Sequence, residues 1–220
     1  MEVLFGTPTY DKTLSVDYVH SIIPTVQELT RQGVNAQWFA LAGNCFIDRA
    51  RNAIVDHFLK STCTDLIFID ADVGWDWQAV TRLLSYDVDI VGGLIPKRAT
   101  DSETEFHSTA LTGRMAGGLF ETKELPTAFM RIRRNAFDVL NTAYPDLKGS
   151  DSACPHTPYF QSGIVNGGFL GEDIFFCRRW DALGQSMWID SDISFSHRGS
   201  KVWRGNFYDH AVNSGLIKKG

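Results

Sequence analysis

The chain has 220 residues, a length that fits one globular domain with a sizeable core. Its 44% hydrophobic and 21% charged residues are typical of globular proteins and exclude an intrinsically disordered chain. The formal net charge of -5 argues against a protein whose main task is to grip nucleic acid, because phosphate binding depends on Lys and Arg. The four cysteines form no CxxC pair, so we expect reduced thiols and a cytoplasmic location.

The first half of the chain alternates short apolar runs with amphipathic stretches. Buried strands are predicted at 2–6, 35–41, 64–72 and 88–95. Helices are predicted at 15–32, 46–60 and 77–84, where apolar residues recur at helical spacing. Strands that are continuous apolar runs and alternate with helices indicate a largely parallel sheet covered on both faces.

The second half of the chain is less regular. The polar, glycine-containing segment 97–126 predicts an irregular excursion or a hairpin, and residues 143–165, rich in Pro and Gly, predict a long loop that is a candidate mobile lid. Strands at 128–132, 187–190 and 193–196, helices at 135–140 and 172–183, and an irregular tail from Gly199 complete the prediction. We therefore expect a single α/β domain over 1–220.

Three DxD triplets occur, so the triplet alone is weak evidence: Asp70/Asp72, Asp87/Asp89 and Asp190/Asp192. The first directly follows the apolar run LIFI, which puts it at the carboxyl end of a buried strand, where ligands of open α/β sheets bind. Residues i and i+2 of a strand face the same side, so we expect Asp70 and Asp72 to approach one hard cation together. The alternative is a pair of solvated or helix-capping aspartates.

Two later segments carry groups that suit the same edge. Glu172 and Asp173 open a predicted helix, where they are either an ordinary acidic first turn or the source of a general base, with Asp173 preferred and Glu172 the alternative. His197 follows a short predicted strand, and a neutral imidazole there is either structural or, beside Asp72, a ligand for a manganese-class ion.

Basic and amide side chains are candidates for phosphate or ribose contacts. Arg51 and Asn52 lie in the second predicted helix and either bind the ligand or form a solvated face. Lys97 and Arg98 follow a predicted strand and either face the same crevice or belong to a solvated loop.

The order of these motifs resembles that of GT-A glycosyltransferases, especially the short stand-alone enzymes of phages and large viruses. The matching pieces are GTPTYD, RARN, LIFIDADVGW, IVGGLIPKR, TAFMRIRRNAFDVL, GEDIFFCRRW and ISFSHRGS. The resemblance implies a GT-A, Rossmann-like fold with a mostly parallel sheet and a smaller antiparallel acceptor-side element.

The resemblance also implies a nucleoside-diphosphate sugar, with a UDP-sugar favoured, and Mn²⁺ or Mg²⁺ at Asp72 and His197, with Asp70 on the same ion or on the ribose. The base of the reaction maps onto Asp173 or Glu172. Acceptor-side contacts map onto Thr127, Ala128 and Phe129. Donor contacts map onto Thr7, Pro8, Thr9, Tyr10, Arg51, Asn52, Asp70, Ala71, Asp72 and Lys97.

The expected acceptor is a hydroxyl of a glycan or of a hydroxymethylated DNA base, and the expected state is a monomer or weak homodimer without membrane insertion. One rival is a haloacid-dehalogenase-like phosphohydrolase, which also places DxD after an apolar strand. That family requires Thr or Val where this chain has Gly74, so we rank it lower. A non-catalytic nucleotide-sugar-binding module is the other rival.

Overall fold

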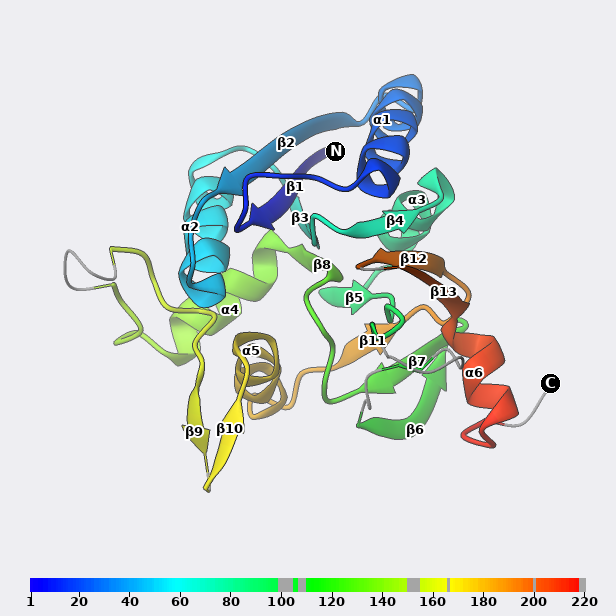
Figure 1. Ribbon diagram of the computed structural model, residues 1–220. Helices are drawn as coiled ribbons and strands as arrows, with labels where there is room; N and C mark the ends of the chain where they lie inside the picture. Colours follow the sequence, from blue (N-terminus) through cyan, green and yellow to red (C-terminus); the bar gives the residue numbers. More distant parts are fainter. Residues whose placement is uncertain (99–104, 107–109, 150–154, 166, 200, 218–220) are drawn as a thin grey trace.

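The computed structural model describes residues 1–98, 105–106, 110–149, 155–165, 167–199 and 201–217, and Figure 1 shows their arrangement. The helices are α1 Val16–Arg31, α2 Ile47–Lys60, α3 Trp77–Ser85, α4 Arg134–Ala143, α5 Glu172–Asp181 and α6 Phe207–Asn213. The strands are β1 Glu2–Thr9, β2 Asn35–Ala42, β3 Asp65–Ile69, β4 Val73–Trp75, β5 Ile90–Gly92, β6 Leu111–Ala116, β7 Leu119–Thr122, β8 Phe129–Arg133, β9 Gly163–Val165, β10 Gly168–Leu170, β11 Met187–Ile189, β12 Ser194–Arg198 and β13 Val202–Asn206.

The central sheet has eight strands in the order β2-β1-β3-β8-β5-β11-β7-β6. Strand β1 pairs in parallel with β2 and β3, and β11 pairs in parallel with β5. Strands β8 and β7 are each antiparallel to both of their neighbours, so the other strands all run in one direction. The predicted mostly parallel sheet is confirmed, and the small antiparallel sheets β10-β9 and β13-β12-β4 provide the smaller antiparallel element.

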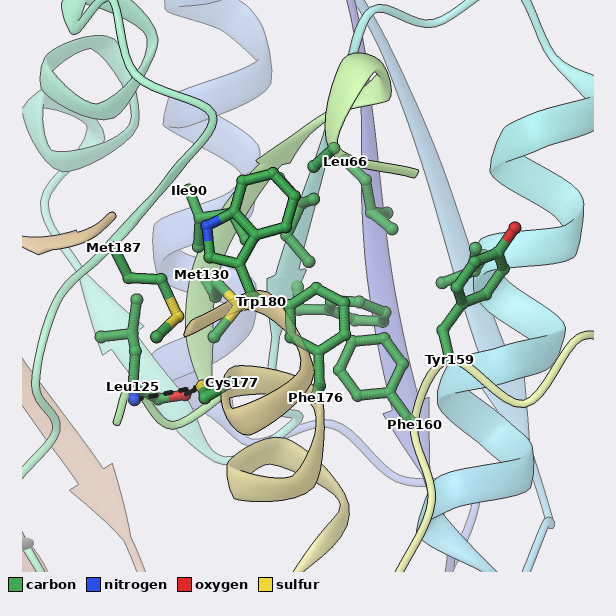
Figure 2. Close-up of a cluster of buried hydrophobic side chains, with 14 of the residues drawn as sticks. Leu66, Ile90, Leu125, Met130, Tyr159, Phe160, Phe176, Cys177, Trp180 and Met187 are labelled. Atoms are coloured by element: carbon green, nitrogen blue, oxygen red, sulfur yellow. Dashed lines mark hydrogen bonds between the residues drawn. The ribbon is translucent and has the colours of Figure 1, made fainter. Parts of the chain in front are cut away.

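Both faces of the central sheet are covered, as the continuous apolar strands require. One core cluster joins the sheet to α2, α4 and α5, and Figure 2 shows how Phe176 and Trp180 of α5 pack within it. The second cluster lies under α1 and α3, where Phe129 and Phe195 meet edge to face with ring centroids 4.8 Å apart. Because both faces of the sheet are packed against helices, the strands are held in place, and so are the loops at their carboxyl ends that form the site.

The structure resolves two predictions for the less regular segments, one in favour and one against. Segment 97–126 contains the hairpin β6–β7, and this hairpin extends the central sheet because β7 pairs with β11. The tail from Gly199 was predicted to be irregular, and that prediction is wrong. Strand β13 pairs with β12, and α6 follows it directly, capped by Asn206, whose side chain accepts a hydrogen bond from the Asp209 backbone N–H.

The segment predicted as a mobile loop, 143–165, is partly held by the core. Tyr159 and Phe160 are buried, and the backbone of Phe160 exchanges two hydrogen bonds with the Asn52 side chain. Strand β9 closes the segment, and residues 150–154 of the loop lie outside the described residues. Its motion as a lid stays a prediction.

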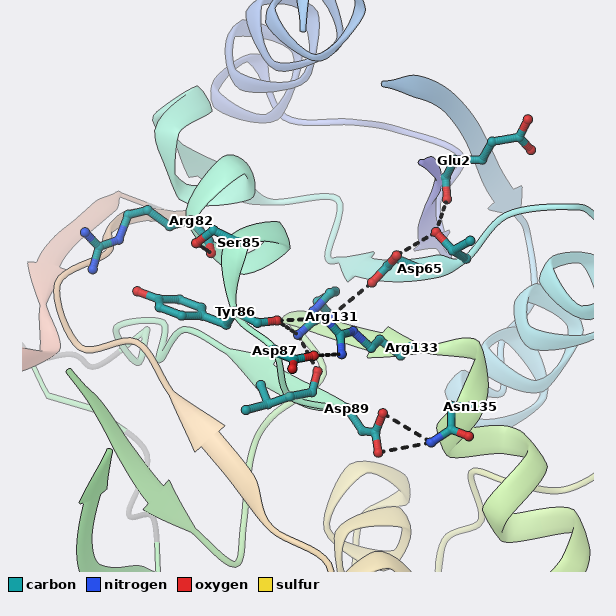
Figure 3. A network of polar contacts seen from close by, with 12 residues as sticks. Glu2, Asp65, Arg82, Ser85, Tyr86, Asp87, Asp89, Arg131, Arg133 and Asn135 are labelled. Atoms are coloured by element: carbon teal, nitrogen blue, oxygen red, sulfur yellow. Dashed lines mark hydrogen bonds and ion pairs between the residues drawn. The ribbon is translucent and has the colours of Figure 1, made fainter. Parts of the chain in front are cut away.

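A buried ion pair connects β3 with β8 at the amino end of β3 (Figure 3). The guanidinium of Arg131 is fully buried and lies 3.0 Å from Asp65 Oδ1. It also donates hydrogen bonds to the carbonyl groups of Tyr86 and Val88. The network ties β3, β8 and the chain before β5 together, on the edge opposite to the carboxyl ends of β1 and β3.

Removal of Asp65 is expected to destabilise the fold strongly, because it leaves a buried guanidinium without its counter-ion. We expect Asp65→Ala to lower the free energy of unfolding by about 3–5 kcal/mol in a denaturant titration. The matched control is Asp87→Ala, because Asp87 pairs with Arg133 from a fully exposed position, where solvent screens the pair and its loss costs little. Equal losses for the two variants contradict this account.

Candidate functional site

A pocket of about 790 Å³ opens at the carboxyl ends of β1 and β3. Ligands of open α/β sheets bind at this end of the strands. The pocket gathers these residues that the sequence predicted for the site: Pro8, Thr9, Tyr10, Arg51, Asp70, Ala71, Asp72, Glu172 and Asp173. It also contains Arg98, for which the sequence left two readings open, and residues not predicted for the site: Asp11, Thr13, Leu14, Ser15, Ile47 and Arg198.

Arg51 of α2 is buried and holds two acids of the pocket at once. Its Nη2 lies 3.1 Å from Asp70 Oδ1, and its Nε lies 3.0 Å from Glu172 Oε1. The guanidinium also stands over the Phe68 ring, 5.3 Å from the ring centroid. One cation therefore connects α2, the end of β3 and the first turn of α5. A charge-assisted contact of this kind is among the stronger hydrogen bonds in proteins.

The turn between β3 and β4 corrects one prediction about the first DxD triplet. Strand β3 ends at Ile69, so Asp70 and Asp72 lie in the turn and do not share one face of a strand. Their carboxylates have different partners: Asp70 contacts Arg51, and Asp72 contacts Arg98 and His197. The structure thus brings Asp72 and His197 together and directs Asp70 to the guanidinium of α2.

His197 of β12 is oriented toward Asp72 by a backbone contact. Its Nδ1 lies 2.7 Å from the Pro96 carbonyl oxygen, and its Nε2 lies 3.5 Å from Asp72 Oδ2. With both ring nitrogens protonated, Nε2–H faces the Asp72 carboxylate. With the proton only on Nδ1, donated to the Pro96 carbonyl, the Nε2 lone pair is available to a cation placed between His197 and Asp72, which is the orientation common to metal-binding histidines. Burial opposes the ionisation of Asp72, yet His197 and Arg98 together lower the pKa of its carboxyl.

These two side chains fit a divalent cation only as part of its ligand set. Among the residues that the structure describes, no group of three or more His, Cys, Asp or Glu side chains is placed to hold a metal ion. Asp72 and His197 offer one carboxylate and one imidazole, a donor set that suits Mn²⁺. The remaining ligands would have to come from a bound substrate and water.

The acids at the start of α5 have different surroundings. Glu172 is engaged by Arg51, whereas Asp173 accepts a hydrogen bond from the backbone N–H of Ile174 at 2.7 Å. Burial, and next the charge of Glu172, raise the pKa of Asp173. The position at a helix N-terminus works in the opposite direction, because the helix dipole favours the charged form. Burial dominates, so the pKa of Asp173 lies above the ordinary value of an aspartate, which suits a proton acceptor.

The loop after β1 forms one wall of the pocket. The Thr9 hydroxyl donates to the Thr13 carbonyl, and the Ser15 backbone N–H donates to the Ala71 carbonyl, so the loop is fixed to the DxD turn. Tyr10 is 73% exposed at the pocket, which leaves its ring free to stack on a planar ligand group. Thr7 is buried away from the pocket, with its hydroxyl 2.6 Å from that of Tyr18.

Several predicted contacts do not reach the pocket. Both the amide nitrogen and the amide oxygen of Asn52 bind the Phe160 backbone, so this side chain joins α2 to the loop before β9 and is not free to bind a ligand. Phe129 is fully buried in the core, and the Thr127 side chain is buried as well. The remaining two residues predicted to contact substrate, Lys97 and Ala128, are partly exposed but do not line the pocket. Phe129, in particular, offers no surface for an acceptor.

The other two DxD triplets have structural partners. Asp87 and Asp89 contact Arg133 and Asn135 at the opposite edge of the sheet (Figure 3). Asp190 is buried and receives two hydrogen bonds from Arg82, which fasten α3 to the end of β11. Position, and not the triplet itself, separates Asp70 and Asp72 from these pairs.

No family model matches the chain, and no curated protein matches it. Among solved structures, the chain is similar to the protein A197 from STIV, with a TM-score of 0.53 and 17% identity over 90% of this chain and 86% of that chain. It is also similar to a mutant of Drosophila β-1,4-galactosyltransferase 7 in complex with manganese, UDP-Gal and xylobiose, with a TM-score of 0.51 and 14% identity over 96% of this chain and 74% of that chain.

These likenesses show the fold, so the predicted GT-A fold is confirmed. None of the helices in the described part of the chain has the length and apolar character needed to span a bilayer.

The raised pKa of Asp173 predicts a stability signature. The folded chain binds a proton at Asp173 more readily than the unfolded chain does, so the ionised carboxylate destabilises the fold at pH values above the folded-state pKa. This cost disappears as the pH falls below the unfolded pKa. We therefore expect Asp173→Asn to raise the Tm at about pH 7 and to lose this advantage toward about pH 4, as measured by thermal melts.

The control for this measurement is Asp87→Asn. The neighbouring Arg133 lowers the pKa of Asp87, so its neutralisation is expected to bring no gain in Tm at neutral pH. If the Tm of Asp173→Asn at about pH 7 is equal to or lower than that of the unsubstituted chain, the raised pKa of Asp173 is contradicted.

Proposed function

We propose that the chain is a metal-dependent glycosyltransferase that moves a sugar from a nucleoside-diphosphate sugar, with a UDP-sugar favoured, to an acceptor hydroxyl. The observation that carries the proposal is the pocket at the carboxyl edge of a GT-A fold. It is lined by Asp72, by the buried guanidinium of Arg51 and by Asp173, a carboxylate of raised pKa. His197 does not line the pocket itself but contacts Asp72 at its margin. A likeness in fold alone would leave the chemistry open, whereas this set of groups supports transfer.

The donor would lie across the pocket from the loop after β1 to the DxD turn. Pro8, Thr9 and the exposed Tyr10 would hold the base, and Asp72 with His197 would hold Mn²⁺ or Mg²⁺ beside the diphosphate. When bound, the cation neutralises charge on the departing diphosphate. Arg51 lines the pocket, and its Nη1 is buried without a hydrogen-bond partner among the described residues, so a small shift of the side chain would give it a ligand oxygen as partner.

Asp173 would act as the general base in a direct displacement. The acceptor oxygen attacks the anomeric carbon, the bond from that carbon to the phosphate oxygen breaks, and the hydroxyl proton passes to Asp173. The nucleoside diphosphate leaves with the bonding electron pair, and the configuration inverts. Glu172 is the weaker candidate because Arg51 already engages its carboxylate. Its contribution would be to fix Arg51 and the first turn of α5.

The described arginines support a glycan acceptor over a hydroxymethylated DNA base. In the cluster around β8, Arg131 is buried and Arg134 donates to four backbone carbonyl groups around the end of α2. In the cluster on α5, Arg178 pairs with Glu124, and Arg179 binds the carbonyl groups of the chain before β9. Cations engaged in this way are poorly suited to grip a phosphate backbone.

The test is release of nucleoside diphosphate from a panel of nucleotide sugars, with and without Mn²⁺. Activity should require the cation, and Asp72→Asn should abolish the cation dependence together with most turnover. Asp173→Asn should lower kcat by roughly 10²–10⁴-fold, the usual contribution of a general base, while Glu172→Gln retains more activity. Asp87→Asn, from a DxD triplet on the opposite edge, should leave turnover unchanged.

Other outcomes would contradict the proposal in distinct ways. Release of phosphate from simple esters would favour the phosphohydrolase, and tight nucleotide binding without turnover would favour a binding module. Near-normal turnover of Asp173→Asn with loss in Glu172→Gln would reverse the assignment of the base. Normal turnover in both variants would point to a retaining mechanism.

A further inference from the structure

Arg98 occupies the carboxylate oxygen that a cation would need. Its Nη1 lies 3.0 Å from Asp72 Oδ2, and the same oxygen faces His197 Nε2 at 3.5 Å. A guanidinium and a divalent cation compete for such an oxygen, because both are attracted by its charge. The guanidinium of Arg98 therefore already occupies the place beside Asp72 and His197 where a cation would bind.

Arg98 is also free to leave this position. Its side chain is 51% exposed, and it lines the pocket that we assign to the donor. An added Cβ at Gly199 would lie 2.9 Å from Arg98 Cδ, so the glycine leaves room for the stem of the arginine. An exposed ion pair of this kind contributes little free energy, so its exchange for another partner is cheap.

Arg198 offers a comparison within the same pocket. It also lines the pocket, but its guanidinium pairs with Asp17 at 2.7 Å, and Asp17 lies outside the DxD turn. The two arginines therefore have similar charge and exposure but different carboxylate partners. Only Arg98 is in a position to compete for Asp72.

We infer that Arg98 is a phosphate-binding residue that pairs with Asp72 while no nucleotide is bound. When the nucleotide binds, Arg98 moves from Asp72 to the donor diphosphate, and this exchange couples cation binding to nucleotide binding. The inference rests on the proposed function, since it takes the diphosphate and the cation to be the ligands of this pocket. With the nucleotide absent, Arg98 lowers the affinity of Asp72 for a cation. With the nucleotide present, the guanidinium released from Asp72 has an anionic partner, so the two ligands bind cooperatively.

The experiment measures Mn²⁺ binding directly, by electron paramagnetic resonance of free Mn²⁺, with and without UDP. Loss of the competing guanidinium in Arg98→Ala should tighten Mn²⁺ binding without UDP by roughly two- to fivefold, the scale of an exposed ion pair. The same variant should weaken UDP binding in the presence of Mn²⁺ by about tenfold or more, because a charged hydrogen bond to phosphate is lost. Arg198→Ala should leave Mn²⁺ binding without UDP unchanged.

The two opposite changes in one variant are the signature of the exchange. Unchanged or weaker Mn²⁺ binding by Arg98→Ala without UDP overturns the inference, while the proposed function stands if the unsubstituted chain still binds Mn²⁺ with UDP. Tighter Mn²⁺ binding by Arg198→Ala also overturns it, because the effect would then be general charge repulsion. Absence of Mn²⁺ binding in every protein, with or without UDP, overturns the metal site and the proposed function together.

Discussion

The buried guanidinium of Arg51 is the contact on which the rest of the site depends. It lies between Asp70 at the end of β3 and Glu172 at the start of α5, and it belongs to a third element, α2. Removal of this cation would leave two acids without their counter-charge, and Glu172 is buried, so the loss is costly. The clamp therefore fixes the position of α5, and α5 in turn places Asp173.

The charged side chains of the pocket have different partners. Arg51 pairs with Asp70 and Glu172, Arg98 pairs with Asp72, and the half-buried Asp173 has a raised pKa. On the opposite edge of the sheet, Arg131 and Asp65 secure the strands without any exposed charge. The groups of the candidate site thus lie at the carboxyl ends of the strands, where ligands of open α/β folds bind.

The sequence predicts the part of this structure that depends on local pattern. Apolar runs locate the strands, and the position of Asp70 and Asp72 after LIFI places them correctly at the carboxyl edge. Pairing across long separations is not visible in one sequence. Arg51 and Glu172 are 121 positions apart, and Asn52 was assigned to the donor because nothing local shows that Phe160 takes both of its amide atoms.

Backbone turns are the other source of error. The apolar run before Asp70 suggests that the strand continues through Asp72, but the chain turns after Ile69 and separates the two carboxylates. The tail was predicted to be irregular because it is polar and spaced by glycines, yet part of it forms β13, which pairs with β12. In both cases tertiary hydrogen bonding, and not local propensity, decides the outcome.

A crystal structure of the chain with UDP and Mn²⁺ tests the central claim most directly. The account predicts an anomalous Mn²⁺ peak between Asp72 and His197, with the diphosphate in the pocket beside Arg51. A nucleotide bound instead in the separate cavity of about 570 Å³ lined by Asp17, Asp76 and Asp209, or a Mn²⁺ peak away from Asp72, would contradict it.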